Sequence, residues 1–259
     1  MKNFFLPVLL LSMSLVACAE ETAADASPYL RLNEDLPEVS REAWEILVAM
    51  TETVSGASKF ALDVEMGHEV LQPNGQRLEF GSHISGTFRR PGEGRVRFDT
   101  REGENASIVM DGETVSVFST RDDRMIYDSA AQPGDINATF NRLTAILGTN
   151  DQLRGFFSMN LTERLAGMVT SGQYLGESTI AGVLCDHLAL RSESEDVQLW
   201  VTKGDRPVPR RLVVTYRDLE GQPRFWAQFE SWDFAPKLAG DTFEFSPPDH
   251  AERVPLFTD

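Results

Sequence analysis

The feature that most constrains the fold is a regular alternation of apolar residues with polar or small ones along two neighbouring segments. Residues 60–70 and 78–88 each place apolar side chains at nearly every second position, and Pro73-Asn74-Gly75-Gln76 between them is typical of a turn. Successive side chains of an extended chain point to opposite faces, so each apolar set lies on one face. The two segments therefore predict a long β-hairpin with one buried face.

Shorter alternating segments, separated by turn residues, continue this pattern along most of the chain. They predict strands at residues 96–98, 108–110, 115–117, 125–127, 174–175, 184–190, 197–201, 211–216, 225–232 and 243–245. Asp111-Gly112, Lys203-Gly204-Asp205 and Leu219-Glu220-Gly221 supply turns. Strands joined in sequence by short turns pair in the antiparallel sense, so the prediction is an antiparallel meander.

Two segments show helical spacing instead. The apolar residues at this spacing are Val39, Ala43, Ile46 or Leu47, Met50 and Val54 within residues 37–56, and Ile136, Phe140, Leu143 and Leu147 before Gly148. Residues 153–169 are apolar enough for one or two further helical turns. Together the elements predict an α+β fold: a single curved antiparallel sheet of about ten or eleven strands with helices on its concave side.

Composition narrows the range of partners. The 259 residues include 24 Lys and Arg against 40 Asp and Glu, a formal net charge of −16. This balance repels phosphate backbones and removes the electrostatic attraction on which nucleic-acid binding depends. No nucleic-acid partner is therefore expected, and the 41% hydrophobic content is that of a globular domain.

The N-terminus predicts export across the inner membrane. Lys2 precedes an apolar run at residues 4–17, which is too short to span a bilayer and is typical of a signal peptide, here residues 1–17. Leu15-Val16-Ala17-Cys18 resembles the bacterial lipobox, which implies a lipidated Cys18, a tether at residues 18–36 and a domain at residues 37–259. Ala19, and not an aspartate, follows the cysteine, which resembles the pattern of lipoproteins that are sorted to the outer membrane. Cleavage after Ala19 or Ala26, giving a soluble periplasmic protein, is the alternative.

No constellation in the sequence predicts catalysis. Cys185-Asp186-His187 combines a thiol, a carboxylate and an imidazole, but on a strand Asp186 points away from the other two. Cys185 is the one cysteine left after Cys18 and is expected to be buried as a small apolar residue. His68, His83 and His250 are scattered without the spacing of a metal site. We predict no catalytic residue, metal or cofactor, and hence no enzyme.

Several motifs, taken in order, resemble a known family. They are Ala43, Leu47, Met50, Phe60, Phe88-Arg89-Arg90-Pro91 and Asp111-Gly112, followed by Gly182-Val183-Leu184-Cys185-Asp186-His187-Leu188-Ala189, Gln198-Leu199-Trp200-Val201, Pro207-Val208-Pro209-Arg210-Arg211-Leu212, Trp232 and Phe243-Glu244-Phe245-Ser246-Pro247-Pro248. On these residues the chain is identified as a member of the predicted periplasmic family called domain of unknown function 2092, and the resemblance extends over about residues 37–257. That family resembles the LolA and LolB lipoprotein carriers, which implies an unclosed half-barrel with a helical lid over an apolar cavity.

The resemblance implies a non-catalytic carrier for a hydrophobic ligand, either a lipid or an acylated protein. The cavity residues would be Phe60, Leu62, Val64, Met66, Leu78, Phe80, Ile84, Phe88, Val96 and Phe98, and the lid residues Trp44, Leu47, Met50, Ile136, Phe140, Leu143 and Leu147. Alternation reports burial without saying what fills the space, so a filled core is equally compatible. The second hypothesis is therefore an envelope interaction or sensor module without a ligand. Ligand identity and oligomeric state stay open.

Overall fold

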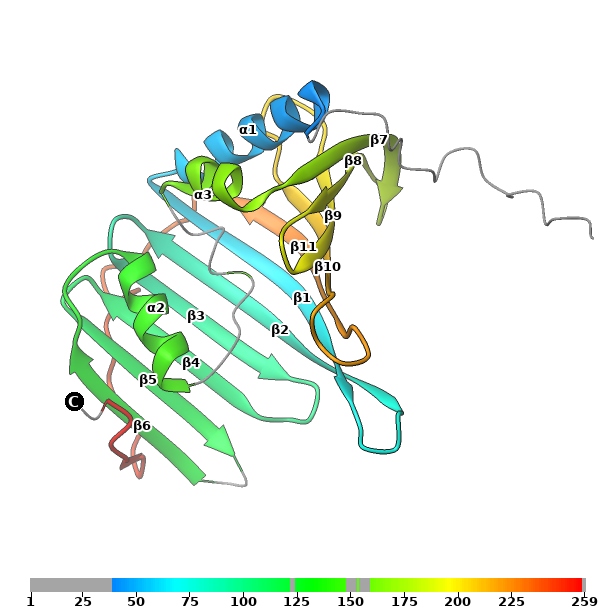
Figure 1. Cartoon of the computed structure of the whole chain (residues 1–259). Helices are drawn as coiled ribbons and strands as arrows, with labels where there is room; N and C mark the ends of the chain where they lie inside the picture. Colours follow the sequence, from blue (N-terminus) through cyan, green and yellow to red (C-terminus); the bar gives the residue numbers. More distant parts are fainter. Residues whose placement is uncertain (1–38, 122–123, 148–152, 154–158, 258–259) are drawn as a thin grey trace, which may run out of the picture. The chain divides into compact units, whose positions relative to one another are not determined.

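A computed structural model describes residues 39–121, 124–147, 153 and 159–257 (Figure 1). The predicted signal peptide, Cys18, the tether and Gly148 lie outside the described residues. One mixed sheet of twelve strands forms the frame, in the order β12-β6-β5-β4-β3-β2-β1-β11-β10-β9-β8-β7. The strands are β1 (Lys59–Leu71), β2 (Arg77–Arg89), β3 (Glu93–Thr100), β4 (Asn105–Asp111), β5 (Thr114–Arg121), β6 (Arg124–Ala131), β7 (Ser171–Ile180), β8 (Val183–Arg191), β9 (Glu195–Thr202), β10 (Pro209–Tyr216), β11 (Arg224–Asp233) and β12 (Glu252–Arg253).

The sheet consists of two meanders that meet at its centre. β1 to β6 follow one another in sequence, and β7 to β11 do the same. The return strand β11 pairs with β1 from Ala61↔Asp233 to His68↔Phe225, so the hydrogen bonds continue across the junction. The long predicted hairpin is confirmed, because β1 and β2 pair over their whole length, from Lys59↔Arg89 to Leu71↔Arg77. Neither edge closes on the other, as an unclosed half-barrel requires.

The first helix, α1 (Arg41–Ser55), begins where the chain leaves the edge of β7. The Ser40 amide donates to the Gly172 carbonyl at 2.8 Å, and the Ser40 hydroxyl accepts from the Ala43 amide at 3.2 Å. This cap satisfies an amide that the first turn leaves unpaired. The helix therefore starts at Arg41, a few residues after the predicted start. Its buried face carries Ala43, Leu47, Met50, Thr51 and Val54.

Two further helices follow β6. The bounds of α2 (Ile136–Leu147) coincide with the predicted helix, and its first turn is capped by Asp135, whose carboxylate accepts from the Ala138 amide at 2.8 Å. The third helix, α3 (Leu161–Met168), lies within the predicted segment 153–169 and contacts α1 through the Thr51 and Thr162 hydroxyls at 2.6 Å. Figure 1 shows α1 and α2 over different parts of the same face of the sheet. The predicted α+β half-barrel with helices on the concave side is confirmed.

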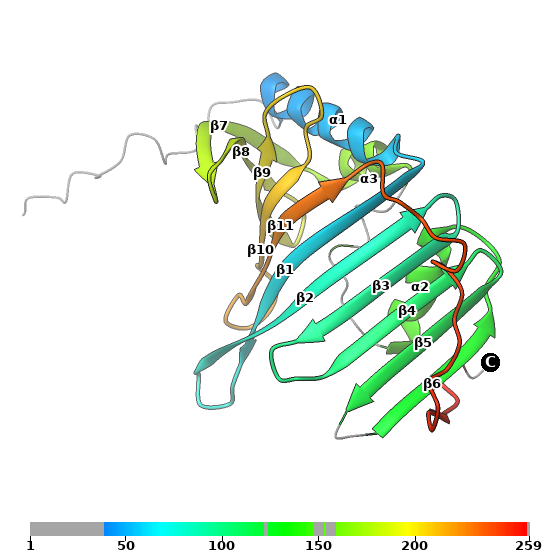
Figure 2. The same cartoon turned by 180° about the vertical axis from the view of Figure 1, so that it is seen from behind.

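The prediction of a strand at residues 243–245 is wrong. This segment crosses the outer face of the sheet as turns and irregular chain, which Figure 2 shows from behind. Phe243 is buried there under the Arg89 guanidinium, 5.2 Å from its ring centroid. The Thr242 carbonyl accepts a hydrogen bond from the Arg95 side chain at 2.7 Å, where a strand would accept one from the backbone of its neighbour. Phe243 and Phe245 therefore alternate because each ring contacts a residue of the sheet, Arg89 and Tyr127 respectively. They do not pair with a neighbouring strand.

The short strand β12 was not predicted. It pairs in parallel with β6 through Glu252↔Ile126 and Arg253↔Tyr127, which makes the sheet mixed and not purely antiparallel. Two charged residues carry no alternating apolar signal, so nothing local marks them as a strand. Their pairing depends on the path of the preceding chain.

Candidate functional site: the helix-covered face of the sheet

The ten predicted cavity residues share one face of the sheet. The pairs Phe60↔Phe88, Leu62↔Gly86 and Val64↔Ile84 place their side chains on the same side of β1 and β2. Val96 and Phe98 of β3 join them, since they pair with Gly86 and Ile84. The face continues to β4 and β5 through the register of Ile108 with Val96 and Val117. The sequence therefore predicts this face correctly.

Burial along this face is graded. Near α1 and α2 the face is filled, because Phe60, Leu62, Val64, Ile84, Phe88 and Val96 are buried side chains of the main core. Met66 and Phe98 are partly buried against that core. At the far end of the hairpin, Leu78 is 37% exposed, and its cross-strand partner Val70 is 38% exposed. One apolar stripe thus passes from a packed interior to solvent.

Glycines make room for the aromatic centre of the filled end. A Cβ atom at Gly94, the cross-strand partner of Phe88, would lie 2.8 Å from the Phe88 ring. Phe88 stacks on Phe60 with ring centroids 4.9 Å apart, and Trp232 lies 6.1 Å from Phe60. The Trp232 indole donates to the Pro209 carbonyl at 3.1 Å. Trp232 is therefore a packing residue whose indole N–H has a hydrogen-bond partner.

The predicted lid residues lie over this centre where the structure describes them. Leu47 and Met50 of α1, and Ile136, Phe140 and Leu143 of α2, are buried in the main core, and Trp44 packs partly buried against it. The rings of Phe140 and Phe88 are 6.5 Å apart, so α2 contacts β2 directly. The Leu147 side chain lies outside the described residues. Helices from two separate segments of the chain thus cover one sheet face.

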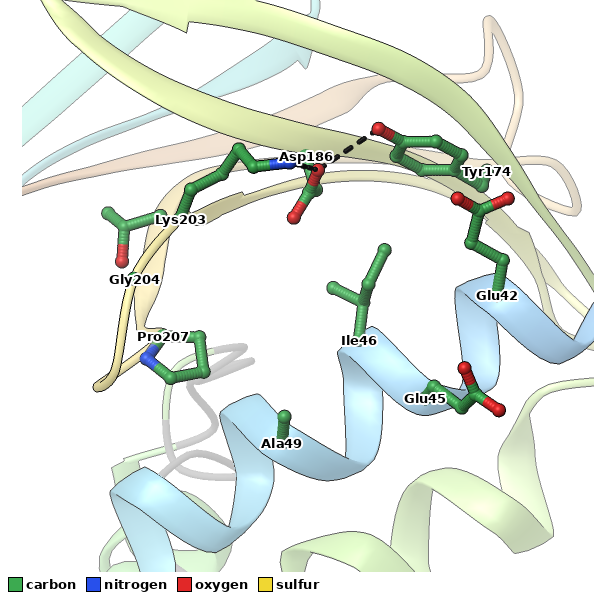
Figure 3. A pocket seen from close by; sticks show the side chains of 10 residues that line it. Glu42, Glu45, Ile46, Ala49, Tyr174, Asp186, Lys203, Gly204 and Pro207 are labelled. Carbon is green, nitrogen blue, oxygen red and sulfur yellow. Dashed lines mark hydrogen bonds and ion pairs between the residues drawn. The ribbon is translucent and has the colours of Figure 1, made fainter.

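A pocket that the sequence did not predict lies beside α1 (Figure 3). Its volume is about 380 Å³, and it is lined by Glu42, Glu45, Ile46 and Ala49 of α1 and by Tyr174, Asp186, Thr202, Lys203, Gly204 and Pro207. Ile46 points from the helix into this space. The residues come from four separate segments, so local periodicity could not have brought them together. At this pocket, α1 is separated from the sheet by open space.

Polar contacts fix the wall of the pocket opposite α1. Asp186 accepts a hydrogen bond from the Tyr174 hydroxyl at 3.0 Å and forms an ion pair with Lys203 at 3.2 Å. Lys203 also pairs with Glu177 at 2.6 Å, and these carboxylates raise the pKa of Lys203. Burial and the neighbouring Asp186 raise the pKa of Tyr174, so both groups stay protonated at neutral pH. An ion-pair network centred on Asp186 and Lys203 therefore forms this wall.

Cys185 and His187 lie on the outer face, while Asp186 lies on the helix-covered face. This is the separation that the strand alternation predicts. Cys185 is fully buried, which raises the pKa of its thiol. His187 stacks on Trp200 at 4.2 Å, and burial lowers the pKa of the imidazole. Within the described residues, no three or more His, Cys, Asp or Glu side chains gather as they would around a metal ion.

A family model matches residues 43–257, and its description is predicted periplasmic protein (DUF2092). The chain belongs to this family. The match covers all twelve strands of the sheet, and the compartment that the family description gives is the periplasm. No curated protein matches the sequence. Among the described residues, no helix has the length and apolar character needed to cross a bilayer.

Three solved structures are similar to this chain at low sequence identity. LprF from Mycobacterium bovis is 14% identical with a TM-score of 0.52, over 80% of this chain and 100% of LprF. MucB is 18% identical with a TM-score of 0.47, over 80% of this chain and 64% of MucB. A LolA superfamily protein from Nitrosomonas europaea is 14% identical with a TM-score of 0.38, over 78% and 97% of the two chains. The LprF match shows a common fold and no more.

Proposed function

We propose that this family member is a non-catalytic periplasmic carrier that binds a hydrophobic ligand, a lipid or the acyl chains of an acylated protein, on the helix-covered face. One observation carries the proposal: the largely apolar stripe on this face, with His68 and Ser82 as its polar members on β1 and β2, extends from the packed core to solvent. If this face served only as a core, its apolar residues would not continue beyond the part of the sheet that the helices cover. The resemblance of the family to the LolA and LolB lipoprotein carriers implies the same class of ligand.

The exposed end of the stripe provides the entrance. Val70 and Leu78 pair at the tip of the hairpin, and behind them the rings of His68 and Phe80 stack with centroids 5.9 Å apart. Met66 then leads to the buried Val64. Each apolar contact along this route removes ligand surface from water, which contributes about 25 cal/mol per Å² before the costs of association. An acyl chain could follow this mainly apolar route from the exposed end to the core.

The helices act as lids in this proposal. α1 presents one apolar face to the sheet, while the pocket at Ile46 and Ala49 leaves its neighbouring face only partly covered. α1 lies outside the twelve strands, so it can move while their pairing stays intact, with its start tied to β7 by the hydrogen bond from Ser40 to Gly172. Displacement of α1 would join the pocket to the apolar interior beneath Leu47. The ligand would replace helix contacts with its own.

Anchoring completes the proposal. Leu15-Val16-Ala17-Cys18 supports lipidation at Cys18, and two or more acyl chains hold a protein stably on a bilayer. We place the lipoprotein at the outer membrane, facing the periplasm, with residues 18–36 as the tether. The acyl chains on Cys18 would fix the membrane from which the carrier collects or delivers its ligand.

A second function is favoured by a specific observation. Phe60, Phe88 and Val64 have no exposed surface, so the centre of the face is already filled by the protein itself. An envelope interaction or sensor module would need no ligand there. The two functions differ in whether a hydrophobic molecule is held by the open end of the stripe.

Native mass spectrometry with lipid extraction distinguishes them. The mature chain would be secreted as a Cys18→Ser variant, which removes the anchor and leaves the described residues unchanged. We expect a co-purifying lipid of defined mass that is lost in the Val70→Glu/Leu78→Glu double variant, because the charges close the entrance. Met168→Glu, on an α3 residue that is 48% exposed, is the matched control and should retain the lipid. A bare protein mass in every sample would contradict the carrier and support the module.

A further inference from the structure

The last residues of the described chain reach the helix-covered face by an indirect path. After β11 the chain crosses the outer face, with Phe243 buried and with Phe245 5.9 Å from Tyr127. It then pairs with the outer edge of β6 as β12, and the Val254 amide donates to the Tyr127 carbonyl at 2.9 Å. The final described residues, Leu256 and Phe257, pack against the main core. We call residues 252–257 the C-terminal latch.

A buried carboxylate holds the latch. Asp128 of β6 is 3% exposed and accepts from the Arg253 guanidinium at 2.9 Å through one oxygen. Its other oxygen accepts from the backbone amides of Leu256 at 2.8 Å and Phe257 at 3.1 Å. Burial raises the pKa of Asp128, but the Leu256 amide, Arg253, the Phe257 amide and the Ser129 backbone together outweigh it and lower the pKa to about 2. The carboxylate is therefore charged at neutral pH, and both of its oxygens accept hydrogen bonds from the latch.

Asp128 occupies a position on the apolar face. It pairs with Val117 of β5, which pairs with Ile108 of β4, so its side chain points toward the helices. A valine or isoleucine would simply continue that face, whereas an aspartate pays for its desolvation only by its contacts. All three of the side-chain contacts named above go to the latch. The residue is explained by the latch and not by the packing of the sheet.

The latch also contacts a lid. The Arg142 guanidinium of α2 lies 5.1 Å from the centroid of the Phe257 ring, within the range of a cation–π contact. Arg142 donates as well to the Ala131 carbonyl at the end of β6, at 2.9 Å. Phe257 thus lies between the sheet edge and α2, with apolar core residues beneath it.

We propose that the C-terminal latch is an internal occupant of the ligand face: Leu256 and Phe257 fill its β6 end under α2, and they must withdraw before a ligand can extend there. This inference rests on the proposed carrier function and adds a regulatory contact to it. The occupant that competes with an acyl chain is a named segment of the protein itself. Its withdrawal leaves the β4–β5–β6 ladder intact, since β12 contributes two paired residues at the edge.

The main test uses Asp128→Asn in the soluble mature chain. Asn keeps the size of Asp but replaces one acceptor oxygen with an NH₂ group, so in either orientation a donor of the latch meets another donor. The matched control is Glu252→Gln on the same latch, where the Arg124–Glu252 ion pair of 3.2 Å is exposed to solvent on both side chains. Hydrogen exchange at the Leu256 and Phe257 amides and the affinity for a fluorescent fatty-acid probe are measured for each protein.

We expect Asp128→Asn to speed exchange at both amides by at least about tenfold and to raise probe affinity several-fold, while Glu252→Gln changes neither. A second variant, Phe257→Ala, removes the occupant but keeps its backbone amide, and it should raise affinity by itself. Faster exchange with unchanged affinity in Asp128→Asn and Phe257→Ala would overturn the inference and leave the carrier function standing. If no form, wild type included, binds the probe, the carrier function fails and the inference fails with it.

Discussion

The two ends of the β1–β2 hairpin obey the same alternation but have opposite environments. At one end Phe60 and Phe88 pair in a core without exposed surface, and at the other Val70 and Leu78 pair with more than a third of their surface in solvent. The strand pairing is identical, so the difference comes from what covers the face. α1 and α2 cover the first end, and nothing among the described residues covers the second to the same extent. Alternation along a strand indicates on which face of the sheet a side chain lies. The helices packed on that face decide whether the side chain is part of the core or part of a binding surface.

The largest expected effect is at the closed end. Phe88→Ala removes a fully buried ring that stacks on Phe60, and large-to-small substitutions of this kind cost about 3–5 kcal/mol. Chemical denaturation with urea measures the loss in free energy of unfolding. Gly94, which leaves room for the Phe88 ring, cannot fill the cavity. A loss below about 1 kcal/mol would mean that this end is already loosely packed and would remove the contrast between the two ends.

The next largest effect is the contribution of Asp128 on β6 to the free energy of unfolding, which depends on pH. The pKa of Asp128 is lowered in the folded protein to about 2, so its contribution is present above the ordinary carboxyl pKa and is lost as pH falls from about 4 toward 2. The shift corresponds to about 2 kcal/mol. Unfolding of wild type and Asp128→Asn should therefore differ at pH 6 and converge near pH 2. Parallel stability curves across this range would contradict the role of the carboxylate.

A smaller effect is expected where the lid begins. Ser40→Ala removes the hydroxyl that accepts from the Ala43 amide, and the loss of such a cap costs about 1 kcal/mol. We expect faster hydrogen exchange in the first turn of α1 and a modest fall in melting temperature. Ser40→Asp, which restores an acceptor, should recover both. If Ala and Asp behave alike, the start of α1 is held by its bond to Gly172 instead of by the cap.

The smallest effect on stability is expected at the open end. Leu78→Ala shortens a side chain that is 37% exposed, so the free energy of unfolding should fall by about 0.5 kcal/mol or less. The same substitution should weaken binding of a fatty-acid probe, because Leu78 lines the proposed entrance. Phe88→Ala and Leu78→Ala would then separate stability from binding along a single strand. Equal losses of stability would show that the open end is covered as well as the closed one.

Much of the fold could be predicted from the sequence because its signals are local. The hairpin, the bounds of α2 and the separation of Asp186 from Cys185 and His187 follow from periods of two and of 3.6 residues. The prediction failed at Phe243 and Phe245, where alternation reports contact with the outer face of the sheet and no strand. Two charged residues formed β12 without any pattern, since a distant edge strand supplied the pairing.

The sequence by itself determined which residues share the apolar face of this protein, because side-chain direction along a strand is set by the backbone. The tertiary structure alone decided how far that face is covered, and it placed Asp128 where three donors of the last described segment converge. It also assembled the pocket beside α1 from segments far apart in the chain. These features depend on contacts between distant residues, and local periodicity carries no information about such contacts.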